Sequence, residues 1–309
     1  MGWFLIVCGV LLLGFLAAAW WAFCYTFKRG HDNVLALLEN TDHFLYPYSE
    51  MIRENMERID LAPHTNVTVT SFDGLSLSAR LYPAENARGV IAVFHGYRSS
   101  SLRDYACAVD MYRGFGFDVL MVDQRAAGNS EGDVITFGVK ERQDTLAWTR
   151  FLSARYGADK PIFLSGISMG AATLMMASAL PLPANVRGIV ADSGFTTPAA
   201  IIGTVAERDF HLPRQLTLPF LNMVSRLFGG FGLYEADALD ALANTRIPVL
   251  FIHGEADSFV PCDMSRHAFE ACASPKRLIT VPGAEHGCGY LIEPERLTAE
   301  LNDFFNEYA

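Results

Sequence analysis

A serine between two glycines is the first residue in this chain whose surroundings indicate chemistry. The sequence GISMG at 166–170 has the pattern G-x-S-x-G, and it stands between an apolar run at 161–164 and an apparent helix at 169–180. In a strand–turn–helix of this kind the serine hydroxyl projects from a sharp turn, and glycines prevent collisions between strand and helix. The N-terminus of the helix directs free N–H groups toward developing negative charge. The sequence therefore predicts that Ser168 is a nucleophile.

A nucleophilic serine requires a base, and four histidines follow Ser168 in the chain. His286 lies in the turn-rich segment PGAEHG (282–287), directly after the last apolar run. His253 ends an earlier apolar run and is expected to hydrogen-bond its own loop. His267 and His211 are expected on a helix face and in an insertion, where structural or solvated roles are more common. We therefore predict that His286 is the base.

The carboxylate that orients the base is expected between the serine and the histidine in chain order. Asp257 lies in HGEADSFVP (253–261), immediately after the penultimate apolar run. Glu255 is close enough to compete, and Asp192 ends an earlier apolar run; both also suit a helix-capping role. The position in the loop favours Asp257.

Acyl transfer also requires N–H donors for the oxyanion that forms during the reaction. One donor is expected from the residue after the nucleophile, Met169, and the other from the loop after the first central strand. That strand ends at His95, and the segment HGY (95–97) places Tyr97 as the second donor through its backbone. Because His95 precedes the nucleophile, we expect it to brace this loop.

The elements that position these residues can be predicted from the apolar pattern. Continuous apolar runs at 90–94, 117–122, 161–164, 188–191, 249–252 and 278–281 alternate with helix-length segments. Uninterrupted apolar strands are buried on both faces, which is typical of a parallel sheet covered by helices. Residues 66–72 and 75–82 alternate around Asp73-Gly74, so an antiparallel pair precedes the parallel strands. The predicted fold class is α/β, with a mostly parallel central sheet flanked by helices.

A long interval between 192 and 248 is rich in Phe and Leu and contains Pro198, Pro213 and Pro219. We expect a helical cap insertion at about 195–245, over the carboxyl ends of the strands. Its large apolar residues either line an acyl pocket or form the core of the cap. They are Phe195, Phe210, Leu212, Leu216, Phe220, Leu221, Leu227, Phe228 and Phe231. Its acidic residues, which an aminopeptidase would use to hold a free amino terminus, are Glu207, Asp209 and Glu235.

The chain begins with an apolar segment, 3–27, that carries no charged residue. As a helix it would be about 37 Å long, enough to cross a hydrocarbon core of roughly 30 Å. Trp20, Trp21 and Tyr25 suit a membrane interface. A cleaved signal peptide is the alternative, but no basic residue precedes the apolar run. We predict an N-terminal transmembrane anchor at 1–29, a helical stalk at 30–65 and the α/β domain at 66–309.

Charge and cysteine content narrow the location and the partners of the domain. The net charge of −10 argues against a nucleic-acid partner. Lys28 and Arg29 follow the apolar segment, so the positive-inside rule predicts a single-pass membrane protein with a cytoplasmic catalytic domain. Six cysteines without a CxxC pair fit free thiols in a reduced compartment. No metal or nucleotide motif occurs, so we expect no cofactor; the oligomeric state stays open.

Taken together, the motifs resemble the α/β-hydrolase superfamily. They look most like membrane-anchored bacterial serine hydrolases with a serine-aminopeptidase-like (S33-type) domain, which are related to α/β-hydrolase domain-containing lipases. Relatives often have a histidine where Ala127 stands here. The similarity runs from about residue 67 to the C-terminus and rests on HGYRSSS (95–101), DQRAAGNSEG (123–132), GISMG (166–170), HGEADSFVP (253–261) and GAEHG (283–287).

The resemblance implies an α/β-hydrolase fold and hydrolysis of an ester, thioester or amide bond. With the residues above, the predicted function is cleavage of an acyl or lipid-like carboxylic ester through Ser168, His286 and Asp257 and an acyl-enzyme intermediate. The alternatives are an aminopeptidase-type amide hydrolase, an acyltransferase, and a catalytically silent membrane-bound binding module.

Overall fold

The centre of the molecule is an eight-stranded sheet in the order β1-β2-β4-β3-β5-β6-β7-β8. This computed structural model describes residues 2–30 and 36–309. Strands β1 (Thr65–Thr70) and β2 (Ser76–Tyr82) pair in antiparallel fashion, and β2 is antiparallel to β4. The strands from β4 across to β8 are parallel: β3 (Gly89–Phe94), β4 (Phe117–Val122), β5 (Ile162–Ile167), β6 (Val186–Asp192), β7 (Val249–Gly254) and β8 (Lys276–Val281). The predicted mostly parallel sheet, with its antiparallel pair, is confirmed.

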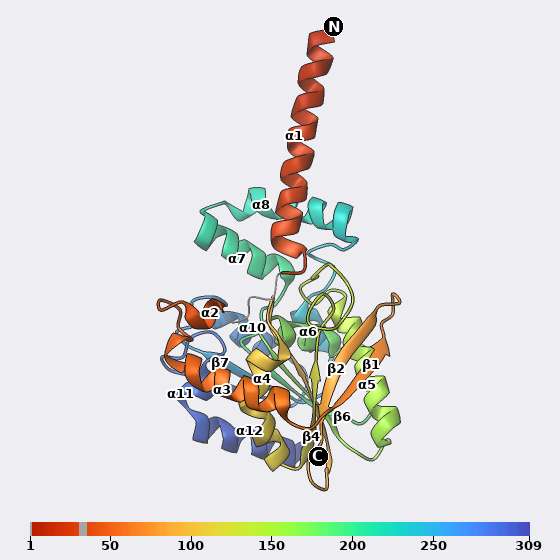
Figure 1. Cartoon of the computed structure of the whole chain (residues 1–309), viewed down its shortest axis with the longest axis vertical. Coiled ribbons are helices and arrows are strands. Elements are labelled where there is room, and N and C mark those ends of the chain that lie inside the picture. Colours follow the sequence, from red (N-terminus) through yellow and green to blue (C-terminus); the bar gives the residue numbers. More distant parts are fainter. Residues whose placement is uncertain (1, 31–35) are drawn as a thin grey trace.

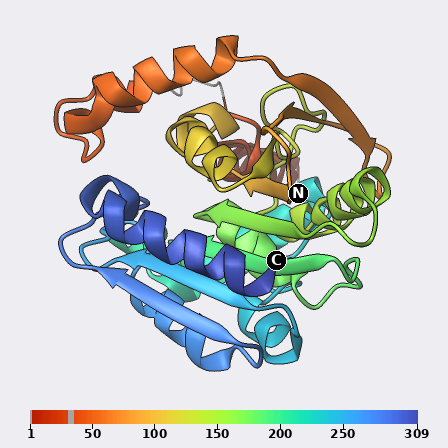
Figure 2. The same ribbon diagram turned by 90° about the horizontal axis from the view of Figure 1, so that it is seen from below.

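Helices cover both faces of the sheet (Figure 2). In β3 the side chains alternate between the two faces: Val90 and Phe94 belong to one buried cluster, while Ile91 and Val93 belong to the other. This two-sided burial is why the strand is continuously apolar. The first cluster includes residues of α5 (Glu141–Tyr156), α6 (Met169–Ala177), α9 (Ala238–Asn244) and α10 (Asp263–Ala271). The second includes residues of α4 (Ser101–Gly114) and α12 (Pro294–Tyr308), and the short α11 (Gly289–Ile292) precedes α12.

The long interval between β6 and β7 contains helices α7 (Pro198–Phe210) and α8 (Arg214–Val224), a π-helical turn η2 (Ser225–Gly229), and α9. Pro198 occupies the first turn of α7, where its missing N–H is tolerated. In Figure 1, α7 and α8 lie beyond the sheet on the side from which the N-terminal helix projects. Of the nine large apolar residues listed from the sequence, three are buried (Phe195, Leu221 and Phe231) and four are exposed (Phe210, Leu212, Leu216 and Leu227).

The N-terminal apolar segment forms helix α1 (Gly2–Phe27), whose part from Ile6 to Phe27 is long and apolar enough to cross a membrane. Its last third is packed into the domain, with Ala19, Phe23 and Phe27 buried. The ring of Phe27 contacts those of Phe137 and Phe231. A backbone hydrogen bond also joins the end of α1 to the domain, because Ile135 N–H donates to the carbonyl of Phe27. The end of α1 is therefore part of the core as well as a projecting rod (Figure 1).

The segment after α1 lies against the domain. It contains α2 (Ala36–Glu39), η1 (Tyr46–Tyr48) and α3 (Ser49–Leu61), while residues 31–35 of the predicted stalk lie outside the described residues. Ile52 and Ile59 of α3 are buried, and Arg58 forms an ion pair with Asp110 of α4. The two isoleucines lie on one face of α3, and that face needs a partner. Residues 36–61 thus pack on the domain, and the division into anchor, stalk and domain stays a prediction.

Candidate active site

Ser168 occupies the sharp turn between β5 and α6. Its backbone angles, φ 55° and ψ −116°, are unusual for a residue with a side chain, and its N–H donates to the carbonyl of Asp192 at 2.8 Å. Strained conformations of this kind persist only where the surrounding structure enforces them, and they cluster at functional sites. The side chain opens onto a cavity at the edge of the sheet.

The glycines on either side of Ser168 are required by close packing. A Cβ atom on Gly166 would lie 2.5 Å from the backbone N of Ala171. One on Gly170 would lie 2.0 Å from the carbonyl O of Phe94 in the neighbouring strand. Both distances are far inside van der Waals contact, so the turn can form only with glycine at these positions.

His286 and Asp257, predicted as base and acid, are in contact. Nδ1–H of His286 donates to Asp257 Oδ2 at 2.7 Å. The other oxygen, Oδ1, accepts the backbone N–H groups of Phe259 and Val260, both at 2.8 Å. Burial alone would raise the pKa of Asp257, but hydrogen bonds from His253 and His286 hold this pKa well below its usual range. The carboxylate therefore stays charged and fixes the orientation of the His286 ring.

The alternative histidines and acids have other partners. His253 is buried, with Nδ1 bonded to Ser265 Oγ at 2.6 Å and Nε2 to the carbonyl of Val260 at 2.9 Å. Its Nε2 also lies 3.1 Å from Asp257 Oδ2, so the His253 ring contacts the Asp257 carboxylate as well. Of the remaining candidates, Glu255 accepts from Thr280, Asp192 accepts from Ser193, His211 is exposed at the end of α7, and His267 lies on α10.

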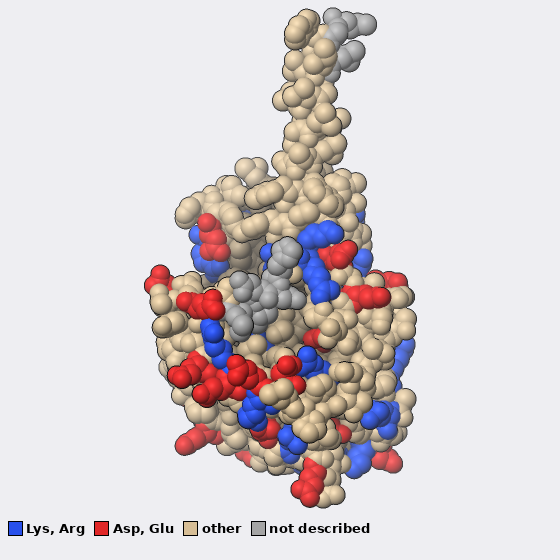
Figure 3. Space-filling view, in the orientation of Figure 1, with Lys and Arg blue, Asp and Glu red and all other residues tan. Residues whose placement is uncertain are grey.

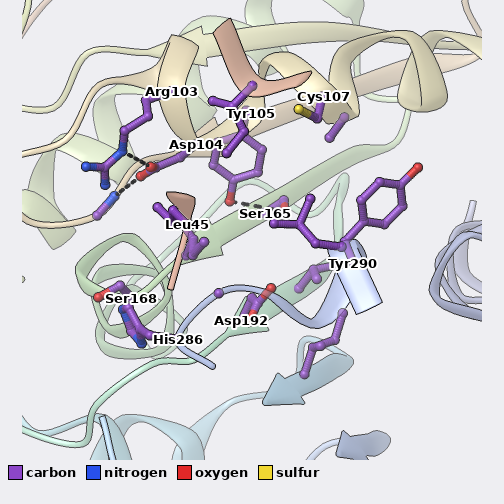
Figure 4. A pocket seen from close by; sticks show the side chains of 18 of the residues that line it. Leu45, Arg103, Asp104, Tyr105, Cys107, Ser165, Ser168, Asp192, His286 and Tyr290 are labelled. Carbon is purple, nitrogen blue, oxygen red and sulfur yellow. Dashed lines mark hydrogen bonds and ion pairs between the residues drawn. The ribbon is translucent and has the colours of Figure 1, made fainter. Parts of the chain in front are cut away.

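Three of the five predicted site residues line one cavity of about 470 Å³. Ser168, His286 and Tyr97 line it together, and Figure 4 draws the side chains of Ser168 and His286 next to each other. From there it extends between the sheet and helices α4 and α12, along Met111 and Leu301. None of the nine apolar cap residues lines it, so in this structure they form the core and the surface of the cap.

The loop that carries Tyr97 is held by a buried carboxylate that the sequence analysis did not single out. Asp104 accepts the N–H of Gly96 at 2.8 Å and the hydroxyl of Ser99 at 2.6 Å. Burial would raise the pKa of Asp104, but Arg103 and the Gly96 N–H hold it below its usual value. As the first residue of α6, Met169 has an N–H free of the helix's own bonding pattern.

His95 braces the same loop from the opposite side. Its Nδ1–H donates to the carbonyl of Gly96 at 2.8 Å, and its Nε2 accepts the backbone N–H of Gln124 at 3.1 Å. One ring nitrogen thus bonds within the Tyr97 loop and the other ties this loop to the segment after β4, in line with the bracing role expected for His95.

The end of α1 holds the Tyr97 loop in place, which the sequence did not reveal. The hydroxyl of Tyr97 donates to the carbonyl of Thr26 at 2.8 Å, and burial raises its pKa to about 12, so it remains a donor. The guanidinium of Arg98 donates to the carbonyls of Tyr25 at 2.8 Å and Lys28 at 3.0 Å. These carbonyls lie at the helix end, where no further turn satisfies them and a cation is favoured.

Replacing Arg98 by alanine is expected to lower kcat by roughly 10- to 100-fold with a smaller change in KM, because it would displace Tyr97, whose N–H is predicted to bind the oxyanion of the transition state. Arg98→Lys, which retains a cation for the carbonyls, is expected to recover part of the loss. The measurement is steady-state hydrolysis of an activated ester by the full chain in detergent micelles. An unchanged kcat in Arg98→Ala would show that this contact does not position the loop.

A family model and a solved structure are similar to this chain. Residues 85–225 match the family model described as serine aminopeptidase, S33. A solved esterase from Pyrococcus furiosus superposes with a TM-score of 0.66 at 23% identity, over 82% of this chain and 93% of the esterase. The chain has the α/β-hydrolase fold, and its residues 85–225 resemble the S33 family.

Individual proteins are also similar to this chain over most of its length. The uncharacterised protein YqkD of Bacillus subtilis is 23% identical over 234 residues, which are 76% of each protein. The lysophosphatidylserine lipase ABHD12 of Danio rerio is 27% identical over 209 residues, covering 63% of this chain and 50% of the lipase.

Within residues 2–30 and 36–309, no cluster of three or more His, Cys, Asp or Glu side chains could hold a metal ion.

Proposed function

We propose that this protein is a membrane-anchored serine hydrolase that cleaves carboxylic esters with an apolar acyl group. The observation that carries the proposal is the juxtaposition of Ser168, in a strained strand-to-helix turn, with His286, whose Nδ1–H is bonded to the buried Asp257. Both Ser168 and His286 open onto one cavity. This is the arrangement that a nucleophile, a base and an orienting carboxylate require.

The proposed reaction has two halves. The hydroxyl of Ser168 attacks the ester carbonyl carbon while Nε2 of His286 takes its proton, and the backbone N–H groups of Met169 and Tyr97 receive the oxyanion. The protonated His286, stabilised by Asp257, then gives its proton to the leaving alcohol as the C–O bond breaks. In the second half, water deprotonated by His286 attacks the acyl-enzyme, and the carboxylic acid leaves as Ser168 regains its proton.

The cavity supports an apolar acyl chain as the group transferred. Its volume is within the range of small-molecule sites. Beyond Ser168 its walls are side chains such as Ile167, Met111 and Leu297, and the hydroxyls of Ser165 and Tyr112 are bonded to each other at 3.1 Å. A chain lying between the sheet and α4 would bury methylene groups, each contributing about 0.8 kcal/mol. The lipase named among the relatives is consistent with such a substrate.

Filling the cavity is expected to shorten the preferred acyl chain. Ala108 lines the wall formed by α4, and Ala108→Phe would occupy space there. We expect kcat/KM for decanoyl p-nitrophenyl esters to fall by about 10-fold or more, with acetyl esters changed by less than about threefold, because only the long chain reaches this depth. Leu216→Phe in the cap is the matched control. A shift in chain-length preference in the control, and none in Ala108→Phe, would place the acyl chain in the cap instead.

Amide hydrolysis at a free amino terminus is the second candidate, because the matched family model is described as a serine aminopeptidase. The acidic residues of the cap are already paired with arginines: Glu207 with Arg214 at 2.7 Å, Asp209 with Arg208 at 2.6 Å, and Glu235 with Arg226 at 3.6 Å. A carboxylate that is already paired is poorly suited to hold a substrate ammonium group. The geometry therefore favours esters.

A substrate panel separates these activities. We expect p-nitrophenyl esters of graded acyl length to be hydrolysed by the full chain with kcat/KM at least about 100-fold above that of aminoacyl p-nitroanilides, since the apolar cavity binds the acyl chain and the paired cap acids leave the amine unbound. Faster hydrolysis of an aminoacyl anilide than of every ester would favour the aminopeptidase.

The anchor is part of the same proposal. Ala17 and Ala19 form a pattern that a signal peptidase could cut, but the helix beyond them supplies Phe23 and Phe27 to the core. Cleavage there would leave Trp20 at a new terminus while the rest of the segment stays bound to the domain. We propose that α1 is retained and enters the membrane, with the basic Lys28 and Arg29 and the catalytic domain on the cytoplasmic side.

A further inference from the structure

Helix α8 and the π-helical turn after it carry a second apolar face that no part of the described chain covers. The exposed residues on this face recur at helical spacing: Leu216, Pro219, Met223 and Leu227, with Leu212 in the loop before α8 continuing the same spacing. Leu216 is 73% exposed and Leu227 is 63% exposed, while Leu221 and Val224 are buried against the domain. A helix on the surface of a soluble protein has one apolar face, and this helix has two. We call the five exposed residues the α8 stripe.

The α8 stripe lies beside the projecting helix. The ring of Phe220 in α8 is 6.0 Å from that of Phe15 in α1, and the ring of Phe228 in η2 is 5.3 Å from that of Trp20. Figure 1 shows α8 at the level where α1 leaves the domain. In Figure 3 charged side chains lie over the lower part of the molecule, whereas α1 and the upper part of the cap show none on this face. The apolar surface of the cap is thus continuous with that of α1.

The length of α1 indicates how close the membrane comes to the cap. Among the α1 side chains whose burial the structure describes, the first buried one is Ala19, and the segment that is apolar enough to cross a membrane, Ile6–Phe27, extends past it. A hydrocarbon core is about 30 Å thick. The span Ile6–Phe27 is about 33 Å long at 1.5 Å per residue, so a bilayer that it crosses extends to the buried part of α1 and hence to the cap. Trp20 and Trp21, both largely exposed near the level of the cap, are suited to the same interface.

We propose that the bilayer entered by α1 also receives the α8 stripe, so that the cap is a second, interfacial membrane contact. This inference rests on the proposed anchor. Two attachments fix the tilt of the domain, whereas a single helix on a flexible spacer would not. The packing of α3 on the domain, in place of a spacer, agrees with this arrangement.

Site-specific fluorescence quenching tests the inference without relying on enzyme activity. Single reporter cysteines are introduced in the full chain as Leu216→Cys in the stripe, Leu12→Cys in α1 and Leu61→Cys on α3, where Leu61 is 85% exposed. Each is labelled with bimane after reconstitution into vesicles of phosphatidylcholine and phosphatidylglycerol, and quenched in turn by nitroxide-labelled lipid and by aqueous iodide. The background removes the four cysteines that are not buried: Cys8→Ala, Cys24→Ala, Cys107→Ala and Cys262→Ala.

We expect nitroxide lipid to lower the emission at 216 and at 12 by about half or more, with little effect at 61, while iodide quenches strongly only at 61. Lipid quenching at 12 combined with iodide quenching at 216 would overturn the cap contact and leave the anchor intact. Protection of 216 from both quenchers would also overturn it and would indicate a second protein chain on the stripe. A chain that fails to float with the vesicles would overturn the anchor itself.

Discussion

Replacement of Ser168 by alanine is expected to lower kcat for p-nitrophenyl esters by about 10⁵- to 10⁶-fold, with KM changed by less than about threefold. The reason is that the hydroxyl is the only group in the proposed site that forms the covalent bond with the acyl carbon. Alanine keeps the Cβ atom and the backbone of the turn, so binding in the cavity and the oxyanion donors at Met169 and Tyr97 persist. The measurement is steady-state hydrolysis by the purified full chain in detergent.

The matched control is Ser178→Ala, at the other end of the same helix. The Ser178 hydroxyl is buried and donates to the carbonyl of Met175 at 2.7 Å, remote from the cavity. We expect its kcat to stay within about threefold of the parent chain, with a loss of stability of about 1 kcal/mol. Thermal unfolding of both variants shows whether the fold is retained. Residual activity of Ser168→Ala within tenfold of the parent chain would contradict its role as nucleophile.

Replacement of Asp257 by asparagine is expected to lower kcat by about 10³- to 10⁴-fold. The amide can still accept the N–H groups of Phe259 and Val260, so the loop is preserved. The amide carries no negative charge, so it no longer stabilises the imidazolium form of His286. It also no longer holds the proton of the neutral His286 ring on Nδ1.

Glu255→Gln is the control for this variant, because Glu255 is in the same loop and bonds to Thr280 instead of His286. Its kcat is expected to change by less than about twofold, since it has no described contact with the base. If Glu255→Gln lost activity and Asp257→Asn retained it, the acid would be assigned wrongly. Measuring kcat of both variants at several pH values distinguishes a shift in the pH optimum from a loss of kcat at every pH.

The elements that the sequence predicted well are those whose pattern is local. The parallel strands could be predicted because burial on two faces leaves no polar position in a run such as β3. The turn at Ser168 could be predicted because its glycines are adjacent in the chain and are required by contacts of 2.0 and 2.5 Å. Chain order then predicted His286 and Asp257 as partners. In the structure, Nδ1 of His286 lies 2.7 Å from Oδ2 of Asp257.

The features that the sequence did not reveal depend on contacts between distant segments. An apolar helix has the same composition whether lipid or protein surrounds it, so nothing in the sequence indicated that Phe23 and Phe27 are core residues. The bonds from Tyr97 and Arg98 to the end of α1 span about seventy residues. The apolar cap residues could not be divided between pocket, core and surface from spacing alone, because α8 is apolar on two faces.

Labelling of the active serine tests the central claim most directly. The full chain is treated with a fluorophosphonate, which phosphonylates a serine only when a base activates it, and the modified peptide is located by mass spectrometry. The account expects one labelled residue, Ser168, with labelling abolished in Ser168→Ala and slowed by at least about 100-fold in His286→Ala. A folded chain in which Ser168 remains unmodified, or in which the same labelling persists in Ser168→Ala, would contradict it.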